Sequence, residues 1–219
     1  MISLALQMSM TISNVNCNGF TVEDEELSHM GSAVYPDVAL INHSCCPNVI
    51  VTYNGNIAEV RAVQKMVPGD EVLTSYIDLL YPTADRNERL RDAYYFTCDC
   101  KECKNKSKDK IKLKVRKFKK TCEPEEIINM AMGVCLYMGD WEGAISYGEK
   151  VLKPYSVIYP PYSMNVASIY QKLGRLYLGL ERKSQGITAL KKAMAIMEVA
   201  HGKDHQYIVE LRKEIGMQT

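Results

Sequence analysis

The chain has 219 residues, of which 47% are hydrophobic and 24% charged, a composition typical of one or two globular domains and not of a disordered or fibrous chain. The net charge of +1 does not favour a globally basic nucleic-acid binder. No run of about 18 uncharged apolar residues is present, and residues 1–16 lack a basic start, so we expect neither a membrane span nor a signal peptide.

Short strands and turns are predicted for the first 100 residues. The β-rich runs 49–53 and 56–63 flank Asn54-Gly55, which is a strong signal for a hairpin. A further strand is predicted over residues 71–77 and a short helix over 83–95, with Thr83 as its N-cap.

Residues 101–120 hold 11 Lys or Arg and 2 Asp or Glu and separate two halves of different character. A solvated linker or an exposed helix start is the favoured interpretation of such a run. A patch for an acidic partner or a nucleic acid is the alternative, but Phe118 is the run's only aromatic residue for stacking on bases.

After the basic run, the apolar spacing predicts helices. The segment LYMG at 136–139 returns as LYLG at 176–179. This pattern of paired helices is similar to tetratricopeptide repeats, and a plain helical bundle is the alternative.

Cysteines offer a candidate metal site. Cys98, Cys100 and Cys103 form C-x-C-x-x-C. The loops between these cysteines are too short to favour disulfides among them. Three thiolates so close together could hold one zinc ion. The fourth ligand would be Cys45 or Cys46, with Cys17 a weaker candidate. Free or redox-active thiols are the alternative.

Three segments, in this order and spacing, carry a family resemblance: NHSCCPN at 42–48, TSY at 74–76 and YYFTCDCKEC at 94–103. The chain resembles the SET-domain protein-lysine methyltransferases, in particular their SMYD (SET and MYND domain) branch. The resemblance implies an α+β fold, with a partial SET-type β region, a post-SET zinc loop and a tetratricopeptide-like helical region. The expected boundaries are 1–96 for the SET part, 97–105 for the zinc loop, 106–128 for the basic linker and 129–219 for the helical domain.

The resemblance also implies roles for individual residues. Tyr76 would be catalytic. S-adenosylmethionine would be bound by Asn42, His43, Tyr94 and Phe96. Substrate would meet Gly19, Thr21, Tyr76 and Tyr94. Zinc would be held by Cys45, Cys98, Cys100 and Cys103. Histone and non-histone lysines would be the substrates, in cytoplasm and nucleus, and the helical tail would bind chaperones or other proteins.

Two family features have no counterpart in this sequence. None of the 13 glycines stand two apart, so the G-x-G segment of the cofactor cradle is missing, and the remaining cysteines cannot build a MYND finger. We therefore expect an N-terminally truncated methyltransferase. The alternative is a non-catalytic, zinc-stapled interaction protein.

Overall fold

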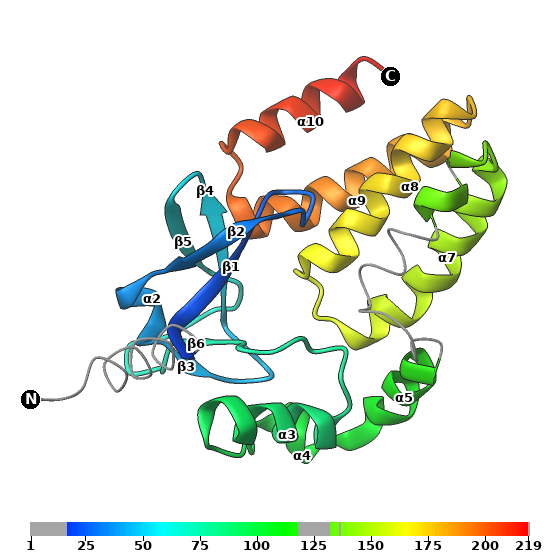
Figure 1. Cartoon of the computed structure of the whole chain (residues 1–219). Coiled ribbons are helices and arrows are strands. Elements are labelled where there is room, and N and C mark those ends of the chain that lie inside the picture. Colours follow the sequence, from blue (N-terminus) through cyan, green and yellow to red (C-terminus); the bar gives the residue numbers. More distant parts are fainter. Residues whose placement is uncertain (1–16, 118–131, 136, 219) are drawn as a thin grey trace, which may run out of the picture. The chain divides into compact units, whose positions relative to one another are not determined.

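The computed structural model describes residues 17–117, 132–135 and 137–218 (Figure 1). The chain divides into two units, one of residues 1–79 and 83–106 and the other of residues 80–82 and 107–219. Part of the expected linker, residues 118–128, lies outside the described residues. Within them, none of the helices is long and apolar enough to cross a membrane.

Within residues 17–106, three two-stranded sheets form the β part of the first unit. Two of them are antiparallel and one is parallel. In that order, their pairs are β1 (Gly19–Glu23) with β2 (His29–Val34), β4 (Val49–Asn54) with β5 (Ile57–Ala62), and β3 (Asn42–His43) with β6 (Leu73–Thr74). Aromatic rings link β1 to β4, because Tyr35 packs against Phe20 at 5.8 Å and against Tyr53 at 5.6 Å between ring centroids.

The predicted hairpin is confirmed, with its turn one residue later than expected. Asn54 pairs with Ile57, so Gly55 and Asn56 form the two-residue loop. Gly55 has a φ of +60°, which a glycine adopts without strain at the first central position of such a turn. The hairpin therefore owes its register to the position of one glycine.

The expected strand over 71–77 is reduced to β6. After Thr74 the chain bends, and the Ser75 hydroxyl donates to the Ile77 carbonyl at 2.8 Å. This local bond replaces the strand ladder beyond residue 74 and frees the following side chains to turn toward a shared site.

The expected short helix is confirmed as α3 (Thr83–Tyr94), with Thr83 as its first helical residue rather than its cap. It ends at Tyr94, and the next residue, Tyr95, has a φ of +61°, the left-handed conformation common just after a helix. The short helices of this unit are α2 (Pro36–Ala39) and α4 (Lys101–Lys104).

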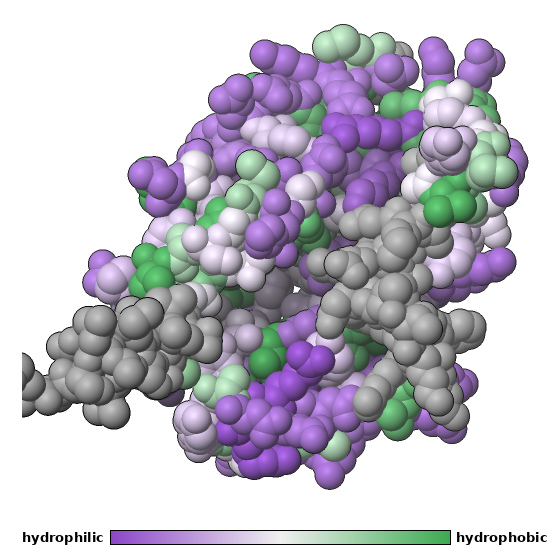
Figure 2. Space-filling view, viewed as in Figure 1, coloured by the Kyte–Doolittle hydropathy of each residue, from purple (hydrophilic) through white to green (hydrophobic). Residues whose placement is uncertain are grey.

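One face of α3 is buried although the helix is mostly polar. Thr83, Arg86 and Leu90 are buried, at the i, i+3 and i+7 spacing of one helical face. The surface over α3 and α4 is largely hydrophilic (Figure 2, bottom). A strongly charged helix thus presents both a solvated face and a buried one.

The basic run is helical as far as residue 117. It covers α4, a 3₁₀ turn (Lys106–Lys108) and α5 (Asp109–Lys117). The interpretation of this run as a helix start is therefore supported for its described residues.

Antiparallel helices that follow α5 form most of the second unit (Figure 1). They are α7 (Trp141–Ile158), α8 (Met164–Gly179), α9 (Lys183–His201) and α10 (Gln206–Gly216). Helix α8 lies between α7 and α9, and α10 packs on α9. The core of the second unit is mainly apolar and includes Leu173, Leu190, Ala193 and Met197, all at most 2% exposed. The expected helical region is confirmed.

Replacing Gly174 with alanine should destabilise the helical unit. A Cβ atom there would lie 2.7 Å from Leu190 Cδ2 and 3.1 Å from the Leu190 backbone nitrogen. Overpacking costs about 1–3 kcal/mol and alanine gains about 1 kcal/mol of helix propensity, so we expect a net loss, because the α9 backbone cannot move aside. Thermal melts should show a lower Tm for Gly174→Ala. Gly216→Ala is the control, since nothing lies within 4 Å of its Cβ, and equal melting of both variants would contradict the prediction.

Candidate active site and metal centre

The segment 42–48 is fastened to β6 by backbone and side-chain hydrogen bonds. Beyond the short parallel pair, Ser44 N–H donates to the Thr74 carbonyl at 2.8 Å and Asn48 N–H to the Leu73 carbonyl at 3.1 Å. The Asn48 side chain accepts from Leu73 N–H at 2.8 Å and donates to the Glu71 carbonyl at 2.8 Å. The Asn48 side chain therefore adds hydrogen bonds to the backbone of residues 71 and 73, where the two-residue pairing of β3 with β6 supplies few.

Asn42 lies at the exposed edge of the β3–β6 crossing, which is the place where the segment 42–48 runs beside β6. Its amide nitrogen donates to the Glu71 carboxylate at 2.7 Å. Glu71 was not expected from the sequence to take part in the site, and its carboxylate orients the Asn42 amide.

Four predicted residues come together as an aromatic group: His43, Tyr76, Tyr94 and Phe96. The Tyr76 ring lies 4.8 Å from Tyr94, 5.2 Å from His43 and 6.4 Å edge-on from Phe96, between centroids. Aromatic pairs at these separations attract one another. Tyr76, Tyr94 and Phe96 pack against the core formed by the cysteines and Leu90. The group is thus held by that core.

The Tyr76 hydroxyl is fixed by the backbone. It donates to the Ile41 carbonyl at 2.6 Å. Burial, and then the neighbouring Tyr94, raise the pKa of Tyr76 above its ordinary value. The phenol therefore stays neutral at physiological pH and can act as a hydrogen-bonding group rather than as a phenolate.

Both ring nitrogens of His43 face protein atoms. Nδ1 accepts from the Tyr76 backbone N–H at 3.0 Å, so the proton of a neutral ring lies on Nε2, which is 3.3 Å from Cys45 Sγ. Burial, and then Arg86, lower the pKa of His43 to about 4, and the ring is neutral. His43 consequently joins the backbone of Tyr76 to the cysteine group.

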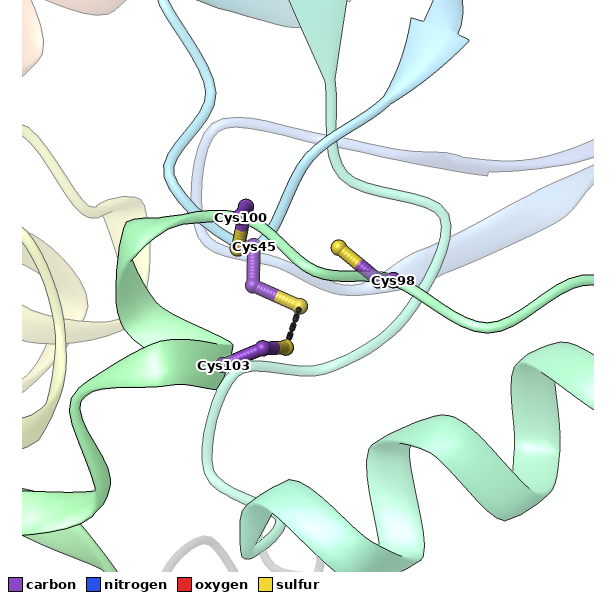
Figure 3. A group of neighbouring side chains, drawn as sticks. All are labelled: Cys45, Cys98, Cys100 and Cys103. Carbon is purple, nitrogen blue, oxygen red and sulfur yellow. Dashed lines mark hydrogen bonds between the residues drawn. The ribbon is translucent and has the colours of Figure 1, made fainter.

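The cysteine group consists of Cys45, Cys98, Cys100 and Cys103, whose sulfur atoms all lie within 4.8 Å of one another (Figure 3). Cys45 follows β3, whereas the other three lie just before or within α4. The sulfurs of Cys45 and Cys103 are 3.6 Å apart, too far for a disulfide. Sulfurs around one tetrahedral zinc ion, each about 2.3 Å from the metal, lie about 3.8 Å from one another. The donor set and its spacing thus fit a tetrathiolate metal site.

The structure resolves the choice of a fourth cysteine. Cys45 is buried, whereas its neighbour Cys46 is exposed and lies outside the group. Cys17 is also exposed, and its thiol donates to the Ala93 carbonyl at 3.4 Å. Cys45 is therefore the partner of the C-x-C-x-x-C segment.

Protonation of these thiols is set by their surroundings. Burial raises the pKa of the Cys45 thiol well above its ordinary value. At Cys100, burial also raises the pKa, but hydrogen bonding to the Cys103 backbone and to Cys98 outweighs it and lowers the value to about 7. A metal bound here would displace thiol protons, because thiolate is the ligand form.

Helix α3 supplies two polar neighbours that the sequence analysis missed, Arg86 and Asn87. The Arg86 guanidinium donates to the sulfurs of Cys45 and Cys103. The Asn87 carbonyl oxygen accepts from Cys98 N–H at 2.7 Å, and its amide lies 3.9 Å from Cys103 Sγ. Both share a helical face with Leu90, and this spacing is the signal in the sequence that could have found them.

Gly19 and Thr21, the remaining predicted substrate residues, lie on β1. Both are exposed, and Phe20 between them points inward. In the described part of the chain, β1 pairs with β2 along one edge. These two residues thus belong to a different sheet from β3 and β6.

Comparisons with known proteins place this site in a class. A model of the SET domain matches residues 8–77, a range that includes β3, β6 and Tyr76. This part of the chain thus matches the SET domain.

Curated relatives narrow the assignment. The chain is 56% identical to N-lysine methyltransferase SMYD2 of Mus musculus and 55% identical to that of Homo sapiens, in each case over 93% of this chain and 59% of the relative. N-lysine methyltransferase SMYD2-A of Danio rerio is 55% identical over 95% of this chain and 60% of the relative. Over most of its length, this chain is therefore similar to SMYD proteins.

Length distinguishes the chain from these relatives, because it spans about three-fifths of theirs. The matched region of the mouse relative covers 254 residues, more than the 219 of this chain. The relative therefore carries residues within the matched region that have no counterpart here.

Proposed function

We propose that this chain is an S-adenosylmethionine-dependent protein-lysine N-methyltransferase with Tyr76 at the centre of its active site. The observation that carries the proposal is the convergence of Tyr76, Tyr94, Phe96 and His43 beside the β3–β6 crossing. Similarity to N-lysine methyltransferases over most of the chain supports it. S-adenosylmethionine would supply the methyl group as part of a positively charged sulfonium.

Tyr76 would position the substrate amine. Its hydroxyl hydrogen is directed at the Ile41 carbonyl, which leaves the oxygen lone pairs to accept a hydrogen bond from a lysine amine. A neutral phenol held in this way orients the amine without competing for its proton. Methyl transfer needs such alignment, and fixed positioning removes much of the barrier.

The neighbouring aromatic rings would form the walls of a lysine channel. Tyr94 contacts Tyr76 directly, and Phe96 lies edge-on to it. Aromatic faces attract cations and restrict how many methyl groups fit beside the amine. Asn42, His43, Tyr94 and Phe96 would contact the cofactor, with Glu71 orienting the Asn42 amide.

Zinc would occupy the cysteine group. Four thiolates are the preferred ligands of a structural zinc ion, and the sulfur positions suit it. The ion would tie the loop after β3 to the segment that enters α4. It would thereby hold the core on which the aromatic group packs.

Protein lysines would be the substrates, in histones and in non-histone proteins. Gly19 and Thr21 on β1 would receive a substrate segment by strand addition. We place the protein in cytoplasm and nucleus, with chaperones or other proteins bound through the helical unit. No specific nucleic acid is expected as a partner.

A non-catalytic role is the second candidate. It is favoured by the lack of a G-x-G segment in this sequence, in which none of the 13 glycines stand two apart. In that role the chain would be a zinc-stapled module that binds partners of a longer enzyme. Binding of S-adenosylmethionine separates the two candidates.

Calorimetric titration of S-adenosylmethionine into the purified, zinc-loaded chain should show saturable one-to-one binding. Asn42→Ala should weaken it, because the variant removes an oriented amide at the β3–β6 crossing. Asn56→Ala, in the exposed turn of the β4–β5 hairpin, is the matched control and should bind as the unchanged chain does.

Mass spectrometry of histone and peptide libraries then measures methyl transfer. Methylated lysine with the unchanged chain would support the enzyme. A folded, zinc-loaded chain that binds no S-adenosylmethionine would refute it and leave the non-catalytic role.

A further inference from the structure

Arg86 is among the largest fully buried side chains in the described residues, with an exposed fraction of 0%. A guanidinium keeps its positive charge in proteins. Burying a charge is costly unless an opposite charge or several hydrogen bonds compensate it. The partners of Arg86 therefore reveal what kind of group the interior of this unit is built to hold.

These partners include two sulfur atoms of the cysteine group. Arg86 Nε donates to Cys45 Sγ at 3.3 Å, and Nη2 donates to Cys103 Sγ at 3.6 Å. Nη2 also donates to Thr83 Oγ1 at 3.1 Å, one turn earlier on α3. A single planar guanidinium thus spans two sulfurs that come from distant parts of the chain.

Charge explains why an arginine suits this place. A neutral thiol is a weak acceptor, whereas a thiolate makes a stronger, charge-assisted bond. Four thiolates around one divalent zinc ion carry a net charge of −2. A buried cation that is hydrogen-bonded to two of these thiolates brings the net charge of the whole assembly from −2 to −1.

We propose that Arg86 is the outer-sphere counter-cation of the cysteine site, orienting the Cys45 and Cys103 sulfurs and strengthening metal retention. The inference rests on the proposed zinc site. It adds a residue outside the ligand set, on a helix that carries no cysteine. Helix α3 is then part of the metal centre.

The guanidinium shape also matters, not only its charge. Nε and Nη2 offer two donors in a fixed fork, which reaches both sulfurs at once. A lysine would bring the charge as a single point on a flexible stem. We therefore expect lysine at this position to replace arginine only in part.

The test compares Arg86→Met and Arg86→Lys with Arg89→Met in the full chain. Arg89 lies on the same helix and is exposed, so its variant controls for removal of an α3 arginine. Competition with a chromophoric chelator measures zinc affinity, and circular dichroism checks that each variant is folded. Loss of an outer-sphere partner lowers metal affinity by about 10- to 100-fold. We expect this loss for Arg86→Met, a smaller one for Arg86→Lys and none for Arg89→Met.

Cobalt substitution provides a second readout in case Arg86→Met does not fold. Hydrogen bonds stabilise the sulfur lone pairs, so their loss should move the sulfur-to-cobalt charge-transfer bands to longer wavelength in Arg86→Lys. A purely structural role for Arg86 would not move these bands. The proposal is overturned if folded Arg86 variants keep both the zinc affinity and the cobalt spectrum of the unchanged chain. Failure of the unchanged chain itself to bind zinc or cobalt would refute the metal site and the Arg86 inference with it.

Discussion

Removal of the metal should lower the melting temperature of the first unit and leave the helices of the second unit folded. The buried core of the first unit includes Cys45, Cys98 and Cys103, with Leu90 as its aliphatic member. Without a metal, these buried thiols have no ion to join them. Metal binding to such a site contributes to folding free energy, about 10–16 kcal/mol in zinc-finger peptides. Calorimetric melts with and without a chelator would measure the effect.

Two cysteine-to-serine variants, one inside and one outside the cysteine group, provide the matched comparison. Cys103→Ser should reproduce the effect of the chelator, because its sulfur belongs to the cysteine group. Cys46→Ser should melt as the unchanged chain does, because Cys46 is exposed and outside the group. Identical melting of the metal-free and zinc-loaded chains would show that the cysteines make no metal-dependent contribution to stability.

Tyr76→Phe should abolish or strongly reduce methyl transfer while S-adenosylmethionine still binds. The variant keeps the ring that packs against Tyr94 and His43 and removes only the hydroxyl. Loss of one fixed hydrogen-bonding group at a reacting centre costs about 10²–10³ in kcat. Turnover of a methylated peptide, measured beside calorimetric binding, would separate kcat from cofactor affinity.

Tyr95→Phe serves as the control for this experiment. Tyr95 is 87% exposed, and its hydroxyl should not affect turnover. If Tyr76→Phe lost cofactor binding and turnover to the same extent, the hydroxyl would have a structural role through its bond to Ile41. Undiminished turnover would remove Tyr76 from the proposed mechanism.

Motif order predicted much of the candidate site. His43, Tyr76, Tyr94 and Phe96 meet as a group, and the C-x-C-x-x-C segment joins Cys45. The residues alone could not show whether Cys45 or Cys46 is the fourth member of the cysteine group, because adjacent cysteines have the same chemistry. The fold distinguishes them by burying one and exposing the other.

Arg86 and Asn87 were not predicted as part of the site, for a different reason. Periodicity finds the buried face of a helix through its apolar residues, and α3 has a polar buried face in which Leu90 is the aliphatic member. The strand expected over 71–77 was too long, because the Ser75–Ile77 bond ends the ladder. The C-terminal helices were predictable because their apolar spacing continues over many turns.

Sequence separation between contacting residues should give the two units different folding kinetics. In the second unit, helices adjacent in sequence pack on one another, and such local contacts favour rapid folding. In the first unit, Tyr76 contacts His43 across 33 residues and Cys103 meets Cys45 across 58. During synthesis, Cys45 therefore leaves the ribosome well before its partner cysteines exist. Closing that long loop should be the slow event, and the supply of metal at that moment should set the yield of folded chain.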